Sequence, residues 1–251
     1  MADKPLVYVI LGAAGSGRRA ILADLIEAGL LPDDRPAVML SDAELPDPLD
    51  ATLPNVTRWT WSDEFIIGTL PKEPSHIFFV TDGRRNPVDQ LETFKTWNEA
   101  QGGDLARIIS VVNCQLAEKH APLLAWYEAC VHFSDVVLLT KREGVGNKWL
   151  SDFRLHFDKQ FYPCLFEMVK DSHTKNPALV LDPQARRMTH VFDAEQDWIF
   201  TDAEGEEIDE QEETEGEEEV EAKVEEDPYF IRDATLKRTK KIPDIGKFLT
   251  A

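Results

Sequence analysis

Apolar runs and helical patterns alternate along the first two thirds of the chain. Residues 6–12 form a continuous apolar run with β-branched side chains, which is typical of a strand buried on both faces of a parallel sheet. Further strands are predicted at residues 36–42, 76–83, 106–114, 135–141 and 165–169. Helical spacing predicts helices ahead of Gly29 and at residues 88–101, 120–131 and 148–161.

This alternation predicts an α/β fold with a mostly parallel sheet and helices on both faces. Polar features follow four strand ends, namely a glycine loop after residue 11, Asp42, the turn at residues 81–83 and the turn at residues 140–143. Ligands of such folds bind at the carboxyl ends of the strands. We therefore expect one site on this rim of the sheet.

Two regions are less regular. Residues 43–74 are rich in Pro and Asp, so we expect irregular structure there with one short helix near residues 61–68. A late strand or hairpin arm is predicted at residues 190–200.

The acidic residues divide the chain into three parts. Residues 202–227 hold sixteen Asp or Glu and one Lys, which accounts for most of the net charge of -20. Such a segment cannot bury enough apolar surface to fold, so a disordered acidic linker is expected at residues 201–227, after a folded domain at residues 1–200. The domain has no basic excess, and we expect no nucleic-acid partner.

The last segment, residues 228–251, mixes aromatic and aliphatic residues with basic ones. It forms a candidate docking arm for this protein, for a second copy or for an unknown protein partner. A disordered tail with incidental apolar residues is the alternative.

The composition favours a cytoplasmic protein. Its three cysteines are widely spaced and form no CxxC pair, as expected of reduced, buried thiols. The histidines show no spacing typical of metal ligands, so no metal site is predicted from them. No apolar run reaches the ~18–20 residues of a membrane span, and no membrane contact is expected.

The candidate chemistry begins with the loop GAAGSGRRA, which follows the first strand and opens the first helix. The spacing Gly12-x4-Gly17 in this context is typical of a phosphate-binding loop. Its amides and the helix N-terminus would face an anion. Arg18 stands where such loops carry Lys, and Arg19 replaces the hydroxyl residue that binds Mg²⁺. A tight strand-to-helix turn without a ligand is the alternative.

Four motifs together resemble those of the CobW/HypB/UreG class of P-loop GTPases, and of its CobW family in particular. They are GAAGSGRRAILADLI, VTDGRRNP, SVVNCQLAEKH and FSDVVLLTKREGV, and they cover residues 5–170 in the family's order and spacing. The CxCC motif with which that family binds transition metals is missing, since no Cys precedes Cys114. A metal-chaperone role is therefore not expected.

The resemblance implies a GTP or GDP site. Phosphates would contact the loop, and Lys141 and Glu143 would contact the guanine base, with Thr140 in place of an Asn that braces the loop. A charged, solvated turn is the alternative for residues 140–143. The expected nucleotide contacts are Gly12, Gly15, Ser16, Gly17, Arg18, Arg19, Lys141 and Glu143.

Catalytic roles are expected for two carboxylates at strand ends. Asp42, with Glu44 close by, would bind Mg²⁺ or position water, and Asp82 would offer a further Mg²⁺ ligand. A helix cap or a loop carboxylate is the alternative for Asp42. Whether Mg²⁺ binds at all is left open, because Arg19 repels a cation.

Three functions are compatible with these residues. The first is a GTP- or GDP-binding protein with weak or absent hydrolysis that regulates a protein partner. The second is a pseudo-GTPase scaffold that binds no nucleotide and acts through its C-terminal arm. The third is a kinase-like P-loop enzyme that prefers ATP. The resemblance also implies a homodimer.

Overall fold

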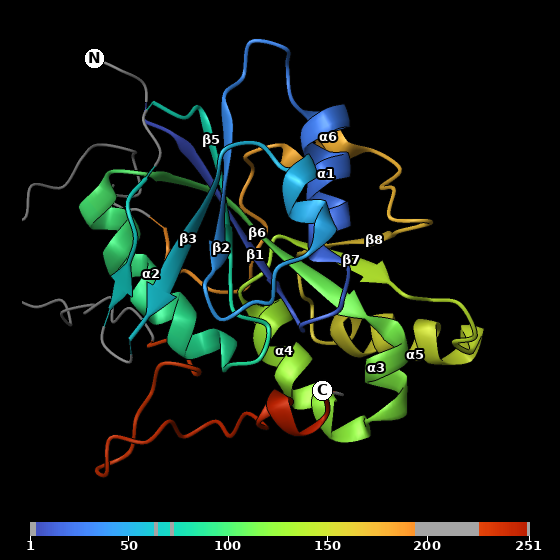
Figure 1. Ribbon diagram of the computed structural model, residues 1–251. Coiled ribbons are helices and arrows are strands. Elements are labelled where there is room, and N and C mark those ends of the chain that lie inside the picture. The colour runs from blue at the N-terminus through green and yellow to red at the C-terminus, as the bar shows by residue number, and fades with distance from the viewer. Residues whose placement is uncertain (1–3, 63–64, 71–72, 194–225, 250–251) are drawn as a thin grey trace, which may run out of the picture.

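The computed structural model describes residues 4–62, 65–70, 73–193 and 226–249. Eight strands form one sheet in the order β4-β3-β2-β5-β1-β6-β7-β8 (Figure 1). Every pair of neighbours is parallel except β3 and β4. The strands are β1 (Leu6–Gly12), β2 (Pro36–Ser41), β3 (Val56–Trp61), β4 (Ile66–Ile67), β5 (His76–Val80), β6 (Asp104–Asn113), β7 (Val136–Thr140) and β8 (Leu165–Met168).

Helices cover both faces of the sheet, as predicted. The α-helices are α1 (Arg18–Gly29), α2 (Pro87–Gln101), α3 (Cys114–Lys119), α4 (Leu124–His132), α5 (Asn147–Asp158) and α6 (Pro177–Leu181). Short 3-10 helices are η1 (Pro48–Thr52), η2 (Ala121–Leu123) and η3 (Ile245–Lys247). None of the helices in the described part of the chain has the length and apolar character needed to cross a membrane.

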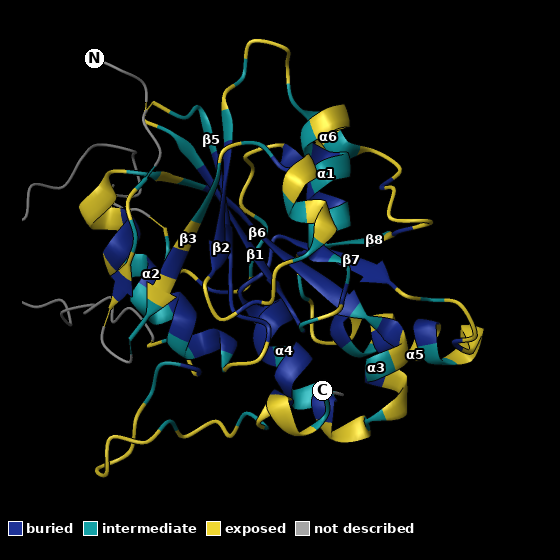
Figure 2. Cartoon of the chain, viewed as in Figure 1, coloured by how far each residue is buried: buried dark blue, intermediate teal, exposed yellow. Residues whose placement is uncertain are grey.

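Strand β1 lies at the centre of the sheet and belongs to two cores. Val7 and Val9 point into a core shared with α2, α4 and α5, whereas Tyr8 and Ile10 point into a core shared with α1 and α6. This follows from the two-residue repeat of a strand, which sends successive side chains to opposite faces. Figure 2 shows the buried residues concentrated along the sheet and on the inner sides of these helices.

The prediction for residues 43–74 was wrong in part. No helix forms in the described residues of the segment 61–68, where β3 and β4 pair as an antiparallel hairpin with Thr60 opposite Ile67. Trp59 is the inward residue of β3, and its ring stacks on Phe79 at 4.7 Å between centroids. Polar residues alternate with aromatic ones in β3, and this half-buried strand pattern was missed among the surrounding Pro and Asp residues.

Two further predictions need correction or lie outside the described residues. The helix predicted at 120–131 begins as the 3-10 turn η2 because Pro122 follows the break at His120. Residues 190–193 form a turn rather than a strand, and residues 194–200 are not described. Residues 201–225 of the predicted acidic linker also lie outside the described residues.

The described part of the C-terminal arm, residues 228–249, packs against its own chain. Tyr229 and Ile245 are buried in the core shared with α2 and α4. The ring of Phe230 stacks on Phe133 with 5.6 Å between centroids. The arm is therefore anchored by apolar side chains although it contains little regular structure.

All three cysteines are buried and unpaired. Burial raises the pKa of the Cys114 thiol to about 12, and it does the same for Cys164. Burial also raises the pKa of Cys130 well above its ordinary value. The thiols fill the interior and carry no reactive thiolate near neutral pH.

Candidate functional site at the glycine loop

The glycine loop leaves the N-terminus of α1 open. Gly17 is the N-cap residue with φ of 90°, a left-handed conformation that glycine adopts without strain. No side chain caps the helix, and its first turn contains no acidic residue. Because the first amides of a helix have no partner within it, this end carries partial positive charge. It can accept an anion.

The loop is braced by the strand that precedes the predicted base-binding turn. The Thr140 hydroxyl lies 2.9 Å from the carbonyl oxygen of Ser16 and 2.9 Å from that of Val112. Thr140 thus ties the loop to β6 and β7. The Ser16 side chain is fully buried, and its hydroxyl has no hydrogen-bond partner in the described residues. A buried hydroxyl without a partner is uncommon in folded proteins.

Two cavities meet above the loop. One of about 610 Å³ is lined by the loop and α1, by residues 44–47 and by Arg84. The other, of about 230 Å³, is lined by Ser16, Thr140, Glu143 and the segment 169–172. Both are also lined by Gly17, Lys141 and Ser172. The loop therefore borders two neighbouring cavities, one at the start of α1 and the other at the turn after β7.

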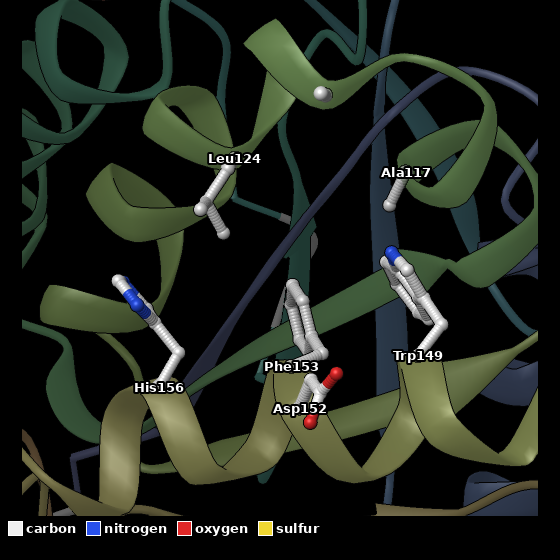
Figure 3. Close-up of a pocket in the computed structure, with 7 residues that line it drawn as sticks. Ala117, Leu124, Trp149, Asp152, Phe153 and His156 are labelled. Carbon is white, nitrogen blue, oxygen red and sulfur yellow. The ribbon is translucent and has the colours of Figure 1, made fainter.

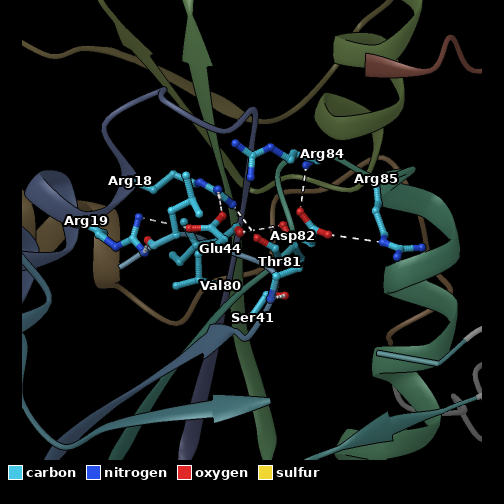
Figure 4. Close-up of polar contacts among 12 residues, drawn as sticks. Arg18, Arg19, Ser41, Glu44, Val80, Thr81, Asp82, Arg84 and Arg85 are labelled. Carbon is cyan, nitrogen blue, oxygen red and sulfur yellow. Dashed lines mark hydrogen bonds and ion pairs between the residues drawn. The ribbon is translucent and has the colours of Figure 1, made fainter. Parts of the chain in front are cut away.

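Arg18 does not extend over the loop in the way expected of a phosphate-binding Lys. Its side chain is 4% exposed. One guanidinium nitrogen, Nη1, donates to the carbonyl oxygen of Thr81 at 2.5 Å, and Nη2 is paired with the carboxylate of Glu44 (Figure 4). The charge of Arg18 is thus already compensated from within the chain.

Arg19 is held by the same acidic segment. Its Nε donates to Asp50 at 2.5 Å, its Nη1 lies 3.2 Å from Glu44, and its Nη2 donates to the carbonyl oxygen of Leu45 at 2.9 Å. Figure 4 shows Glu44 between the two arginines. Residues 44–50 therefore close over the start of α1 through ion pairs.

The residues present do not fit a Mg²⁺ ion at this loop. Mg²⁺ prefers oxygen ligands, and Arg19 supplies none where a hydroxyl is expected. The nearby carboxylates of Glu44 and Asp50 are both engaged by guanidinium groups. In the residues that the structure describes, no group of three His, Cys, Asp or Glu side chains could hold a metal ion.

The backbone of the turn after β5 packs closely against the backbone of the glycine loop. The amide of Ala14 donates to the carbonyl oxygen of Gly83 at 2.9 Å. A Cβ atom at Gly83 would lie 2.3 Å from the Ala14 nitrogen and 2.6 Å from Nη2 of Arg18. Only glycine permits this approach, so the turn at residues 81–83 is part of the site.

The carboxylate of Asp82 interacts with residues of its own turn. It accepts a hydrogen bond from the Arg84 amide at 2.9 Å, and it lies 3.3 Å from Nε of Arg85 (Figure 4). The backbone amide of Asp82 donates a hydrogen bond to the side-chain oxygen Oε1 of Gln90 at 2.7 Å. Asp82 does not line either cavity at the loop, and a role in catalysis stays a prediction.

Asp42 is exposed and accepts a hydrogen bond from Thr60 at 2.7 Å. It lines neither cavity, so the structure does not bring the two expected catalytic carboxylates together at the loop. Glu44, two residues further along the chain, lines the larger cavity at the loop instead. The direction of each side chain depends on the bend after β2, which the sequence pattern does not show.

Lys141 and Glu143 both line the smaller cavity, and their role in binding a base stays a prediction. Lys141 adopts a left-handed backbone with φ of 50°, which turns the chain sharply after β7. The Glu143 carbonyl oxygen accepts a hydrogen bond from Gln115 at 2.6 Å. Both residues are exposed and accessible to a ligand.

The remaining predicted contacts divide into two groups. Gly15, Ser16 and Gly17 line the cavities, whereas Gly12 packs against β6, since a Cβ atom there would lie 2.5 Å from the Val111 carbonyl oxygen. Asp50 and Arg84 were missed by the sequence analysis. The only local signal for Asp50 is the Asp47-to-Asp50 capping box around η1, which predicts a helix start and no partner for Arg19.

A separate cavity of about 230 Å³ lies between α5 and the segment of α3, η2 and α4 (Figure 3). Ala117, Leu124, Trp149 and Phe153 give it a mainly apolar lining, with His156 at one end. It shares no residue with the cavities at the loop.

The parallel sheet, the glycine loop between β1 and α1, and the polar turns after β5 and β7 form an open α/β fold with its candidate site at the carboxyl ends of the strands. No protein-family model matches the chain, and no curated protein matches its sequence.

Three solved structures are among those similar to this chain. A zinc-bound triple mutant of the YjiA GTPase is 16% identical, with a TM-score of 0.46 over 73% of this chain and 67% of that chain. The hydrogenase maturation factor HypB from Archaeoglobus fulgidus is 14% identical, with a TM-score of 0.43 over 66% and 81%. HypB from Helicobacter pylori, solved with nickel, is 11% identical, with a TM-score of 0.43 over 65% and 78%.

Proposed function

We propose that the chain binds a guanine nucleotide along the carboxyl edge of its sheet. The phosphates would lie at the N-terminus of α1, and the base would lie in the smaller cavity beside Lys141 and Glu143. The observation that carries this proposal is the pair of cavities that meet at Gly17, Lys141 and Ser172. Uncapped helix amides line one end, and a carboxylate suited to the N–H groups of guanine lines the other.

Within this proposal, nucleotide hydrolysis is weak or absent, and the bound state regulates a protein partner. Phosphoryl transfer requires positioned positive charge on the phosphates, usually with Mg²⁺. Here the Mg²⁺ ligands do not fit, and Arg18 and Arg19 are paired with Glu44 and Asp50. A ligand that recruits either arginine must displace Glu44, which lowers affinity.

Calorimetric titration with GTP, GDP and ATP, each with and without Mg²⁺, tests this function. We expect GTP and GDP to bind in preference to ATP, with little change on adding Mg²⁺. Glu143→Gln should weaken GDP about tenfold, which is ~1.4 kcal/mol, and leave ATP unchanged. Asp42→Asn is the matched control, because it alters an exposed carboxylate that does not line the site.

A specific observation favours a second function, a pseudo-GTPase scaffold that binds no nucleotide. Carboxylates of the chain itself form ion pairs with both arginines. The Ala14 amide donates to the carbonyl oxygen of Gly83, where a phosphate would otherwise accept that hydrogen bond. The same titration separates the two functions. Absence of heat and of thermal stabilisation at millimolar GDP would reject the nucleotide site and favour the scaffold.

A further inference from the structure

The turn at residues 82–86 lies beside the C-terminal arm as well as beside the glycine loop. Asp244 of the arm and Asp82, Arg84 and Arg85 of the turn line one cavity of about 590 Å³. A Cβ atom at Gly246 would lie 4.0 Å from the carbonyl oxygen of Arg84. The arm therefore reaches the backbone of the turn that presses on Ala14.

The arm is also fixed to the helix that continues from this turn. Arg238 donates to Asp89 at 2.7 Å and to Glu92 at 2.5 Å, and Arg232 donates to Glu92 at 2.6 Å. Both carboxylates belong to α2, which begins at Pro87. The Arg238 side chain is only 7% exposed, so its two ion pairs are partly shielded from solvent, whereas Arg232 and Glu92 are both about 40% exposed.

One short segment thus connects the site to the chain end. Gly83 has almost no free space beside Ala14 and Arg18, so a ligand that takes the Ala14 amide must move the turn. A displaced turn changes the surface that lies against Asp244 and Gly246 of the arm. It also changes the start of α2, whose first two turns carry Asp89 and Glu92.

We propose that the C-terminal arm responds to occupancy of the glycine loop, so that an anion seated there loosens the arm from the turn and α2. This inference rests on the proposed nucleotide site as the source of the anion. Coupling between two sites is reciprocal in free energy. Loosening the arm must therefore raise the affinity of the loop for the same ligand by the same factor.

Limited trypsin digestion of the full chain measures arm release, since Lys240 and Lys241 are exposed trypsin sites within the arm. GDP, with binding followed by calorimetry in the same buffer, should increase cleavage of the arm at least fivefold. Arg238→Gln should raise cleavage without ligand and tighten GDP binding. Arg154→Gln, an exposed arginine on α5, is the matched control and should change neither.

The outcomes separate the inference from the proposed function. If GDP binds and the cleavage rate does not change, the coupling is rejected and the nucleotide site stands. If GDP binds to neither the native chain nor Arg238→Gln, the nucleotide site is rejected. The coupling is then decided by Glu44→Gln, which frees Arg18 beside Gly83 without any ligand. Because this variant is also less stable, its cleavage is compared at Lys240 and Lys241 of the arm and at Arg154 of α5. Faster cleavage confined to the arm supports the coupling, and cleavage that is unchanged or equally faster at both places overturns it.

Discussion

The guanidinium of Arg18 and the carboxylate of Glu44 form an ion pair in which both side chains are at least 93% buried. The pair joins the first residue of α1 to the segment after β2, across the space where a ligand of the glycine loop would sit. Removing one partner of a buried pair leaves the other charge uncompensated, which is strongly destabilising. An incoming phosphate could replace the lost carboxylate.

Glu44→Gln should lower the free energy of unfolding by about 3 kcal/mol, because Arg18 loses its buried counter-charge. Added pyrophosphate should recover part of this loss and should stabilise the variant more than the native chain. Urea unfolding with and without pyrophosphate measures both effects. Asp42→Asn should stay within about 0.5 kcal/mol of the native chain. Equal stabilisation of the native chain and Glu44→Gln by pyrophosphate would show that Glu44 does not compete with anions.

Gly83→Ala should destabilise the chain by about 3 kcal/mol or more, because the new methyl group meets the backbone of Ala13 and Ala14 at less than 3 Å. Gly146→Ala is the matched control. It has φ of -67°, and its nearest neighbour is Glu118 Oε1 at 3.5 Å. Thermal unfolding of both variants checks the comparison, and similar melting temperatures would refute the tight approach at Gly83.

Thr140→Val removes the hydroxyl that braces the glycine loop while keeping the volume of the side chain. We expect a loss of about 1–2 kcal/mol in unfolding free energy, because the buried Ser16 carbonyl loses a donor. Thr140→Ser keeps the hydroxyl and serves as the control. Denaturant titration measures the stabilities. A Thr140→Ser variant as unstable as Thr140→Val would point to packing rather than the hydrogen bond.

Asp227 should make the attachment of the arm sensitive to acid. Burial pushes the pKa of Asp227 upward, but hydrogen bonds from His132, Thr189 and the Tyr229 amide outweigh burial and hold it below its ordinary value. A folded pKa below the unfolded value of about 3.9 stabilises the fold above that pH. This contribution is lost as the pH falls through the folded pKa.

The pH effect is measured by comparing the native chain with Asp227→Asn in denaturant at pH 6 and at pH 3. The native chain should be more stable by about 1–2 kcal/mol at pH 6, and the difference should shrink at pH 3. A difference that is the same at both pH values would contradict a role for the ionised carboxylate.

The parallel core was predictable because each of its central strands is a continuous apolar run. β1, β5 and β7 lie where those runs predict them, and the turns that follow them meet on one rim. β3 and β4 were missed because a half-exposed strand alternates polar and apolar residues, and the two residues of β4 are too few for a pattern. Local periodicity identifies buried strands better than edge strands.

The loop itself was also predictable, but the partners of its arginines were not. Arg18 and Arg19 lie 26 and 31 residues from Glu44 and Asp50 along the chain, and no local pattern connects them. The same holds for Arg238, whose partners Asp89 and Glu92 are about 150 residues away. Sequence spacing placed the backbone of the site, whereas the directions of its charged side chains depend on tertiary packing.

Burial of the native thiols has a practical consequence for studying the arm. Cys114, Cys130 and Cys164 are buried, and burial raises the pKa of each thiol, so maleimide dyes should leave them largely unlabelled in the folded protein. A single cysteine introduced at exposed Lys241 would then take up a fluorophore selectively. The movement of the chain end can thus be followed by fluorescence anisotropy without first replacing any natural cysteine.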